Sequence, residues 1–419
     1  MKIVYFNYIS NTIGPIIRTL ELAKGCSDNG VVVSLYFMHK DFSPPEFVYE
    51  RIKSYQSDTL HIHYNTRHES SLQNISSQPQ TSPKKSPGEP KMRLRGLVKQ
   101  AVFSLFHIPQ ELKILKSEKP DAVMARPDHA FSFCFSTKIA RVPLVLDTDG
   151  PVEELALYWG ISSQALVKFD TWRAKTSHAI MVISNVCKDL LQAKMSNRDC
   201  FYIVPNGTHK DEFAPQPQAS RDALKRQWGL EGCRVIGYSG NQRVWHGLPN
   251  LLKASLPLLQ KDKSLKVLII GCGINNELMK QCEVPEDIFN NQIIFTDRLS
   301  YWDMASHIDL ADIMVMPYDI LEIFYFSPMR MFEAMSLGKS IITSNQGQMH
   351  DLLDERSSVM FFDPNTPNGL HDALASTVYN DPFISSGMKN REYLIAEHTW
   401  RHRGETTKEA IRYAINNYK

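Results

Sequence analysis

The sequence lacks the cysteine pairs and the long apolar runs that mark several classes of protein. Its seven cysteines are an odd number, no two form a Cys-x-x-Cys pair, and none has a histidine nearby at metal-binding spacing. We therefore expect neither structural zinc nor a disulfide framework. Apolar runs such as 267–270 are far shorter than the ~20 residues of a membrane-spanning helix. With no small-residue cleavage site near Met1, we expect a cytoplasmic protein, or one peripheral to the cytoplasmic face of a membrane.

An excess of charge of either sign is also missing. Lys and Arg number 47 and Asp and Glu 45, which gives a net charge of +2. Any basic surface must be local, so we expect no nucleic-acid partner. The 419 residues are 43% hydrophobic, as in ordinary globular proteins, and this length favours two domains.

Short β-rich runs alternate with helix-like stretches over most of the chain, which predicts an α/β fold with parallel sheets. The runs form two series, at 2–6, 31–37, 121–125, 143–147, 179–183 and 201–204, and at 234–239, 266–270, 292–296, 312–316, 340–343 and 358–362. Two series indicate two Rossmann-like domains, with ligands at the carboxyl ends of the strands. Pro215 and Pro217, each followed by a glutamine, indicate a linker. We place the domains at 1–212 and 233–398, with a linker at 213–232.

Residues 76–90 interrupt this alternation, because they contain four prolines and no aliphatic residue. Such a segment buries too little surface to order itself, so we predict a mobile loop that is dispensable for folding. The following residues, 92–106, have apolar side chains at helical spacing with Lys and Arg between them. This pattern fits a core helix with a basic outer face, which is the commoner case, or a helix lying on an anionic membrane.

The segment from Ser327 to Gly338 predicts a helix suited to a nucleotide. Ser327 as N-cap, Pro328 in the first turn and Gly338 at the far end would delimit it. A helix that starts at the carboxyl end of a strand offers free N–H groups to a phosphate. Arg330 would add a cation suited to a diphosphate, and Glu333 could accept both hydroxyls of a ribose.

Ser327 to Lys339 resembles the motif S-P-x-K-x-x-E-x-M-x-x-G-K of the retaining GT-B glycosyltransferases of family four (glycosyl transferases group 1). Further resemblances follow in the family's order along the chain: Val204-Pro-Asn-Gly-Thr208 with Phe213, Tyr238-Ser-Gly240, Trp245-His-Gly-Leu248, Leu268-Ile-Ile-Gly-Cys-Gly273 and Phe361-Phe-Asp-Pro364. Each motif alone is weak, but their order makes the resemblance specific.

The resemblance implies two Rossmann-like domains that face each other across a cleft, with the donor nucleotide held mainly by the second and the acceptor by the first. It also implies that a last helix, 399–419, packs back on the first domain. Its donor-binding set would be Gly14, Arg298, Leu299, Tyr325, Ser327, Pro328, Met329, Arg330 and Glu333.

Two positions depart from the family pattern. Where the family has its first glutamate, for the donor sugar, this chain has Tyr325, and Glu322 would substitute only if the loop differs. We interpret Tyr325 as altered sugar recognition. The family's phosphate-binding Arg and Lys pair is also missing, and Arg243 and His246 are the best substitutes. A histidine beside a diphosphate should hold its proton more firmly.

The first domain offers weaker candidates. Gly14 follows the first strand and would let a ligand approach the backbone, as in the family's acceptor-side loop. Asp149, after a strand that also ends in Asp147, would lie near the reacting centre, although a simple turn role fits it equally well. His61 and His63 share one face of a strand-like run, but without a third ligand they give little support to a metal site.

From these observations and the resemblance, we expect a retaining glycosyltransferase that moves a sugar from a nucleoside diphosphate sugar to a hydroxyl acceptor. Its catalytic residues would be Asp149, Arg243, His246 and Arg330, acting mainly by electrostatic stabilisation of the departing diphosphate. We expect no cofactor and no metal requirement. The acceptor would belong to cell-surface polysaccharide or glycolipid assembly and could be lipid-linked. The alternatives are a small soluble metabolite as acceptor, or a non-catalytic GT-B partner subunit.

Overall fold

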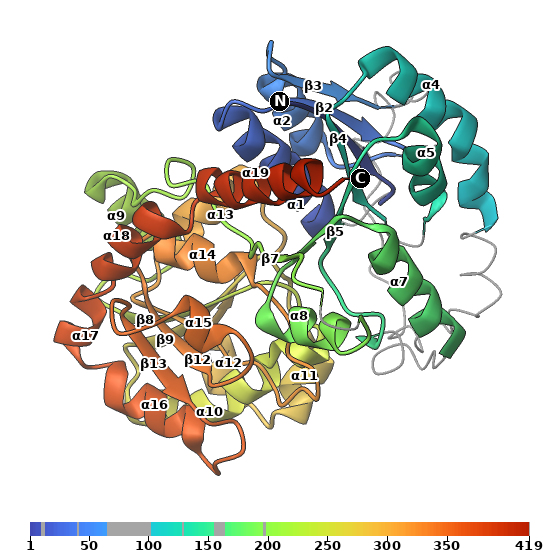
Figure 1. Ribbon diagram of the computed structural model, residues 1–419. Helices are drawn as coiled ribbons and strands as arrows, with labels where there is room; N and C mark the ends of the chain where they lie inside the picture. Colours follow the sequence, from blue (N-terminus) through green and yellow to red (C-terminus); the bar gives the residue numbers. More distant parts are fainter. Residues whose placement is uncertain are drawn as a thin grey trace. The chain divides into compact units, whose positions relative to one another are not determined.

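The computed structural model of the chain forms two compact units, coloured along the sequence in Figure 1. Unit 1 comprises Met1–Pro205 and Trp400–Lys419, and unit 2 comprises Asn206–Thr399. The structure describes residues 1–9, 13–39, 42–64, 102–127, 130–154, 164–195 and 198–418. The predicted loop 76–90 and residues 92–101 of the predicted amphipathic helix lie outside these ranges. Each unit is a parallel sheet with crossover helices, so the predicted fold class is confirmed.

Unit 1 is built on a seven-stranded parallel sheet in the order β3-β2-β1-β4-β5-β6-β7. Its strands are β1 (Lys2–Asn7), β2 (Val32–Phe37), β3 (Leu60–His63), β4 (Ala122–Arg126), β5 (Leu144–Thr148), β6 (Ala179–Val182) and β7 (Phe201–Ile203). Its helices are α1 (Ile13–Asp28), α2 (Glu46–Tyr55), η2 (Leu105–His107), α4 (Ile108–Glu118), α5 (Ser132–Ala140), α7 (Gln164–Thr176), α8 (Asn185–Gln192) and α19 (Trp400–Asn416). The strand order reverses between β1 and β4, where Asn7 pairs with Arg126. In open parallel sheets, ligands bind at the carboxyl ends of such a strand pair.

The last helix, α19, completes unit 1 by packing along α1 (Figure 1). The two helices cross at Gly25 and Gly404, where a Cβ atom on either residue would overlap the backbone of the other helix. Trp400, Ala410, Ile411 and Ala414 are buried on the inner side of α19. The chain therefore enters unit 2 after residue 205 and returns at residue 400 to finish unit 1.

Unit 2 has a six-stranded parallel sheet in the order β10-β9-β8-β11-β12-β13. Its strands are β8 (Arg234–Ser239), β9 (Leu265–Ile270), β10 (Ile293–Phe295), β11 (Ile313–Met316), β12 (Ser340–Ser344) and β13 (Val359–Phe362). Its helices are α9 (Gln218–Gln227), η3 (Val244–His246), α10 (Leu248–Lys261), α11 (Asn276–Gln281), α12 (Glu286–Gln292), α13 (Tyr301–Ile308), α14 (Met329–Ser336), α15 (Met349–Leu352), α16 (Gly369–Thr377), α17 (Asp381–Ser385) and α18 (Met388–Glu397). Here the order reverses between β8 and β11.

Both faces of this sheet are covered, which explains why its strands are mostly apolar. Val267 and Ile269 of β9 belong to a cluster on one face, together with buried leucines of α10. The alternate residues Leu268 and Ile270 belong to a second cluster with α13, α14 and α18 on the other face. Side chains alternate between the faces of a strand, so a strand buried on both faces has few positions that favour a charged side chain.

The boundary between the units differs from the predicted linker at 213–232. Phe213 is 1% exposed and belongs to the core of unit 2, and residues 218–227 form helix α9. Pro215 and Pro217 precede this helix, and Pro217 is its N-cap residue. At that position a missing N–H group costs nothing, so the prolines open a helix where the sequence suggested an unstructured connection.

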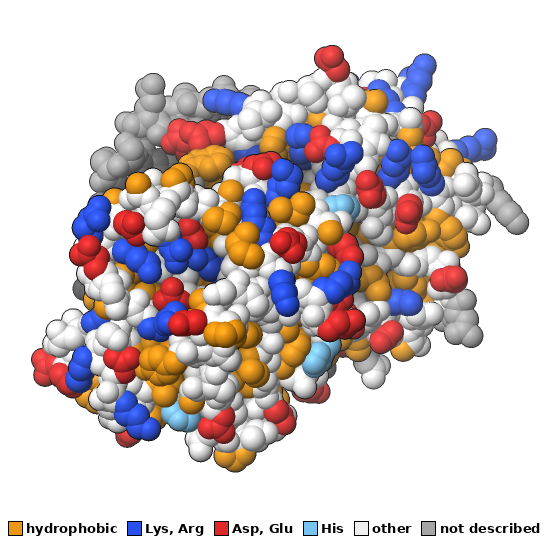
Figure 2. Space-filling model, turned by 90° about the vertical axis from the view of Figure 1, so that its left-hand side faces the viewer, with side chains coloured by type: hydrophobic (Ala, Val, Ile, Leu, Met, Phe, Trp, Pro, Cys, Tyr) orange, Lys and Arg blue, Asp and Glu red, His pale blue; other side chains and the backbone are white. Residues whose placement is uncertain are grey.

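Charges of both signs are interspersed on the face of the molecule drawn in Figure 2. Lys and Arg side chains there alternate with Asp and Glu, and hydrophobic side chains lie between them. This distribution agrees with the near-neutral net charge of the sequence.

Candidate functional site

The candidate residues of unit 2 lie at the strand-order reversal between β8 and β11. The chain after β8 carries Gly240 to His246, and the chain after β11 carries Tyr318. Arg330, in the first turn of α14, reaches this edge, since its Nη1 donates to the carbonyl of Ser239 at 2.8 Å. The sequence thus places its donor-binding candidates where a doubly wound sheet is expected to bind a ligand.

Arg330 is held between two tyrosines. Its guanidinium carbon lies 5.7 Å from the ring centre of Tyr238 and 5.2 Å from that of Tyr318. Its Nε also donates to the Tyr318 hydroxyl at 3.2 Å. Gly240 permits this approach, because a Cβ at that position would lie 2.6 Å from Nη1 of Arg330. The guanidinium is therefore fixed before any ligand arrives, which lowers the cost of ordering it on binding.

His246 and Arg243 lie on the neighbouring loop. The Nδ1 atom of His246 is 3.2 Å from the carbonyl oxygen of Asn241, so this nitrogen carries the proton and Nε2 is left as an acceptor. Burial, together with the charge of Arg330, lowers the pKa of His246 to about 3. The histidine is thus neutral in the ligand-free protein. The expectation that its pKa is raised concerns only the protein with a diphosphate bound beside it. Arg243 is exposed and lies 5.1 Å from the ring centre of Trp245.

Glu333 lies one turn after Arg330 on α14. Burial raises the pKa of its carboxyl group to about 7, although the charge of Arg330 opposes this shift. A carboxyl group that titrates near neutrality can accept two hydroxyl hydrogen bonds when ionised and fewer when protonated. Its position and its chemistry fit the ribose-binding role that the resemblance implies.

The start of α14 differs from the prediction. The helix begins at Met329, its N-cap residue is Pro328, and no side chain caps it. The hydroxyl of Ser327 instead accepts the backbone N–H of Asn206 at 2.9 Å, and the Ser327 carbonyl accepts Nδ2 of Asn206 at 2.6 Å. Ser327 thus ties the Val-Pro-Asn-Gly turn to α14, because Pro328 already supplies the N-cap backbone conformation. The first N–H groups of α14 remain without a side-chain cap.

Three further motif residues have environments that the sequence did not reveal. Tyr325, expected to contact the donor sugar, is 6% exposed and packs on Phe326 with ring centres 4.5 Å apart. Glu322, its possible substitute, is exposed. Lys339, which ends the motif, is buried and pairs with Asp309 at 2.7 Å. Lys339 therefore stabilises the fold of unit 2 and does not face a ligand.

The loops after β8 and β9 are joined by Gln242, which the sequence analysis did not single out. Its Nε2 donates to the carbonyl of Gly273 at 2.7 Å, and its Oε1 accepts Nδ2 of Asn275 at 2.8 Å. The predicted donor residues Arg298 and Leu299 follow β10, the outer neighbour of β9, with Arg298 exposed and Leu299 partly buried.

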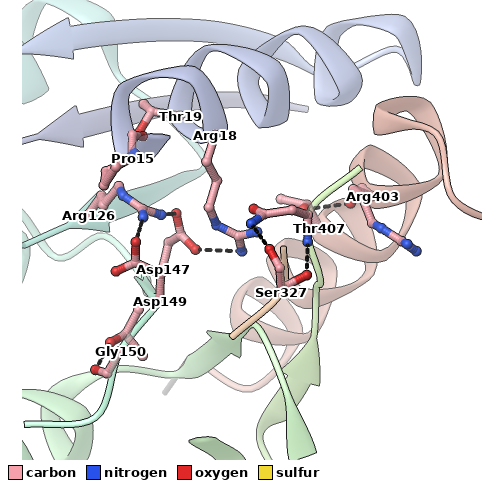
Figure 3. A network of polar contacts seen from close by, with 12 residues as sticks. Pro15, Arg18, Thr19, Arg126, Asp147, Asp149, Gly150, Ser327, Arg403 and Thr407 are labelled. Carbon is pink, nitrogen blue, oxygen red and sulfur yellow. Dashed lines mark hydrogen bonds and ion pairs between the residues drawn. The ribbon is translucent and has the colours of Figure 1, made fainter. Parts of the chain in front are cut away.

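Unit 1 contains a buried charge network at the carboxyl ends of β4 and β5 (Figure 3). Asp147 accepts Nη1 of Arg126 at 2.7 Å, Nη2 of Arg18 at 3.1 Å and the hydroxyl of Tyr5 at 2.7 Å. Burial alone would raise the pKa of Asp147, but Arg18 and Arg126 lower it to about 2. The carboxylate is therefore ionised at any physiological pH.

Asp149 joins this network through Nη2 of Arg126. Its side chain is 40% exposed, whereas that of Arg126 is 1% exposed. One buried guanidinium thus holds both the buried Asp147 and the accessible Asp149, beside the strand-order reversal of unit 1. Arg126 was not predicted as a site residue from the sequence, although it ends a buried strand next to the one that contains Asp147.

The other candidate residues of unit 1, Gly14, His61 and His63, do not form a common site. Gly14 is the second residue of α1 and not part of a turn, because the helix already begins at Ile13. On β3, His63 stacks on Tyr36 with ring centres 4.2 Å apart, and His61 is exposed. Within the described residues, no three His, Cys, Asp or Glu side chains are grouped to hold a metal ion. The same residues include no helix long and apolar enough to cross a membrane.

Comparison with known proteins places these features in context. Residues 233–380 match the family described as Glycosyl transferases group 1. The chain is 23% identical to a D-inositol 3-phosphate glycosyltransferase of Corynebacterium jeikeium (strain K411) over 201 residues, which are 46% of this chain and 47% of that protein. The match thus spans about half of that relative.

Two solved structures match the fold over nearly the whole chain. Anabaena HepE in complex with UDP superposes with a TM-score of 0.69 at 14% identity, covering 98% of this chain and 100% of that one. A glycosyltransferase from Rickettsia africae ESF-5 gives 0.69 at 15% identity, covering 99% of each chain. The fold is that of the GT-B glycosyltransferases.

Proposed function

We propose that the protein transfers a sugar from a nucleoside diphosphate sugar to a hydroxyl acceptor with retention of configuration, because residues 233–380 match the family Glycosyl transferases group 1 and the chain has the GT-B fold. The observation that carries this proposal is the fixed Arg330 at the β8 and β11 reversal, with Glu333 one turn further along α14. Unit 2 binds the donor, and unit 1 contributes the acceptor side.

The charges of unit 2 suit a departing diphosphate. Arg330 and the uncapped start of α14 supply fixed positive charge, and Arg243 adds to it. His246, neutral in the ligand-free protein, would add a charge once a bound diphosphate raises its pKa. In the reaction, the bond from the sugar C1 to the diphosphate oxygen breaks, and a bond from C1 to the acceptor oxygen forms on the same face. The acceptor proton passes to a leaving phosphate oxygen, so no side chain has to act as base. Fixed dipoles and cations of this kind supply the largest share of many enzymatic rate enhancements.

On the acceptor side, we assign Asp149 as a group that accepts a hydrogen bond from an acceptor hydroxyl. Arg126 holds one of its oxygens, and the partial exposure of the side chain leaves the other accessible. Asp147 is fully buried and saturated with donors, so it positions Arg126 and does not contact substrate.

Two acceptor classes fit the proposal. The first is a lipid-linked or polysaccharide intermediate of cell-surface assembly, which a peripheral membrane protein could reach. The second is a small soluble metabolite, which the name of the Corynebacterium relative favours. A non-catalytic role as a partner subunit would fit the buried Tyr325, and it predicts nucleotide binding without turnover.

A panel of nucleotides tests the donor proposal. UDP, GDP, ADP and dTDP would be added to the full chain, and thermal unfolding and release of nucleotide from the matching glucose donors would be measured. A nucleotide at 100 times its Kd should add about 2.7 kcal/mol of stability. Because we expect no metal requirement, turnover should persist in EDTA. If no nucleotide stabilises the protein, the proposal fails, and if one stabilises it without turnover on any acceptor, the partner-subunit alternative gains.

A matched pair of variants locates the donor site. Arg330→Lys should abolish the stabilisation by nucleotide, because Lys cannot bridge Tyr318 and Ser239. Arg234→Lys is the control, since Arg234 also lies in unit 2 but at the opposite end of β8, where it pairs with Asp381. Equal nucleotide binding by the two variants would remove Arg330 from the site.

A further inference from the structure

Exposed apolar side chains of unit 1 gather on three helical segments. The segments are residues 102–107, which include η2, helix α5 and helix α7. Among the large hydrophobic side chains that the structure describes as exposed in unit 1, all except Met1 and Ile13 lie on them: Val102, Phe103, Leu105, Phe106, Phe135, Ile139 and Trp172. Phe106 is 74% exposed and Ile139 62%. Concentration of this kind is unusual on a soluble surface and marks an interaction site.

The three segments form one continuous surface. The hydroxyl of Ser104 accepts the backbone N–H of Phe131, next to the start of α5, at 3.2 Å. The rings of Phe135 and Trp172 lie 5.7 Å apart and join α5 to α7. Phe103 and Phe106 pack on each other with centres 5.3 Å apart. We call this surface, made of residues 102–107, α5 and α7, the aromatic face.

The described end of the predicted amphipathic helix belongs to this face. In residues 102–106, the apolar Val102, Phe103, Leu105 and Phe106 are exposed, whereas the polar Ser104 is 4% exposed. A core helix would show the reverse arrangement. At this end of the segment, the apolar side chains face outward, away from the core of unit 1.

The exposed charges of the aromatic face are all basic. Lys138 lies in the last turn of α5, Arg141 is the C-cap residue of that helix, and Lys168 and Lys175 flank Trp172 on α7. The one acid in these segments, Asp170, is 8% exposed and pairs with Arg173 at 2.6 Å. This arrangement contrasts with the mixed charges of the face in Figure 2.

We propose that the aromatic face binds the surface of an anionic lipid bilayer. Phe106, Ile139 and Trp172 would enter the boundary between head groups and acyl chains, where aromatic and branched side chains are favoured. The four exposed cations would meet the lipid phosphates, each contributing a similar electrostatic increment. The inference extends the proposed function, since a bilayer is where a lipid-linked acceptor would be found.

Vesicle sedimentation tests the proposal with the full chain. The probes are vesicles of phosphatidylcholine with about one third phosphatidylglycerol and vesicles of phosphatidylcholine alone. We expect binding to the anionic vesicles at ~0.1 M salt and its loss at ~1 M, where the Debye length falls to about 3 Å. Lys138→Glu with Lys168→Glu and Lys175→Glu should weaken binding about a hundredfold. Phe106→Ser with Ile139→Ser should weaken it about tenfold or more at ~0.1 M salt.

Two control variants make equivalent changes on unit 2. Lys253→Glu with Lys261→Glu and Lys389→Glu reverses as many exposed lysines, and Tyr379→Ser with Ile395→Ser removes two exposed apolar side chains. Both controls should bind vesicles as the unchanged chain does. Since all substituted residues are exposed, circular dichroism should show unchanged folding.

Three results would overturn the proposal. They are absence of binding to anionic vesicles at low salt, equal binding by the control and test variants, and a dimer in sedimentation equilibrium that the Phe106 and Ile139 variant abolishes while vesicle binding remains. The last result would assign the face to a second copy of the chain. Vesicle binding needs no sugar donor, so a protein that does not bind vesicles would contradict the membrane proposal and leave the proposed transfer reaction untouched. A protein that binds vesicles without any turnover would contradict only the proposed transfer reaction.

Discussion

At the scale of single residues, the carboxyl group of Glu333 makes the donor site sensitive to pH. Its pKa of about 7 lies above the usual value near 4.5 because the folded protein buries it. Between these two values the folded state binds more protons than the unfolded state, so this group lowers stability as pH rises from 4.5 to 7. The ionised form that is costly for the fold is the form that best accepts a ribose diol.

We therefore expect Glu333→Gln to gain stability relative to the unchanged chain on going from pH 5 to pH 8, by the order of 1 kcal/mol. Urea unfolding at both pH values measures this difference. Glu333→Ala at pH 8 should weaken binding of the stabilising nucleotide by about 1.5–3 kcal/mol for each charged hydrogen bond lost. Unchanged affinity by calorimetry would place Glu333 outside the site.

The two carboxylates of the network around Arg126, Asp147 and Asp149, should contribute unequally to the stability of unit 1. Asp147→Asn leaves Arg18 and Arg126 buried without their shared counter-charge, and we expect a loss of about 3–5 kcal/mol in the free energy of unfolding. Asp149→Asn removes the charge of a side chain that is 40% exposed, and should cost at most about 1 kcal/mol while impairing transfer to the acceptor. Denaturant unfolding of the two variants separates these roles.

Acid titration gives a second measure of Asp147. A carboxylate with a lowered pKa contributes stability above its unfolded value of 3.8, and this contribution is lost as pH falls toward 2. The stability of the unchanged chain should therefore fall more steeply over this range than that of Asp147→Asn. Parallel curves would show that the network does not hold the charge of Asp147.

The residues that the sequence identified share a local motif, and those it missed do not. Arg330 and Glu333 lie on one short helix, and the residues that mark its two ends can be recognised in the sequence. Arg126, by contrast, acquires its role from Asp147 and, through it, from Tyr5, whose hydroxyl bonds Asp147 from 142 positions away. No spacing rule joins such residues, because only the sheet order brings β1, β4 and β5 together.

At the scale of elements, the glycine pair between α1 and α19 fixes how closely these helices approach. Gly404→Ala would gain helix propensity, yet its Cβ would overlap the backbone at Gly25, so we expect a net loss of about 1–3 kcal/mol. Gly14→Ala is the matched control, because a Cβ at that position of α1 meets nothing within 4 Å. It should be neutral or stabilising by up to about 1 kcal/mol. Thermal unfolding compares the two, and a stabilised Gly404→Ala would contradict the close crossing.

Helices and strands could be predicted from the sequence where a residue pattern fits only one kind of structure. Strand β11 consists of apolar residues, and β9 of apolar residues apart from Lys266, because both faces of the sheet are covered. This pattern is visible without a structure. Helix α9 was hidden, since its two preceding prolines are equally typical of linkers and of helix starts. The α14 cap was misassigned for a similar reason: Ser327 has the residue type of an N-cap, but Asn206 engages its hydroxyl.

At the scale of the whole molecule, unit 2 is one continuous stretch of chain, while unit 1 is assembled from two. We expect residues 206–399 expressed alone to fold cooperatively and to keep nucleotide binding, because the core clusters of unit 2, Arg330 and Glu333 all lie within that range. Residues 1–205 alone should not fold stably, since the side of α1 that packs against α19 would be exposed to solvent. Thermal melting of both fragments, followed by circular dichroism, tests this prediction. Adding a peptide of residues 400–418 should restore cooperative folding to the fragment 1–205. A stable fragment 1–205 would contradict the prediction.

The return of α19 to unit 1 also orders events during synthesis on the ribosome. Unit 2 can fold as soon as residue 399 has left the exit tunnel, whereas unit 1 waits for residues 400–416 even though its first strand was made at the outset. The earliest part of the chain is therefore the last to be completed. During that interval the apolar side of α1 lacks its cover, and it is there that a nascent-chain chaperone would have a surface to bind.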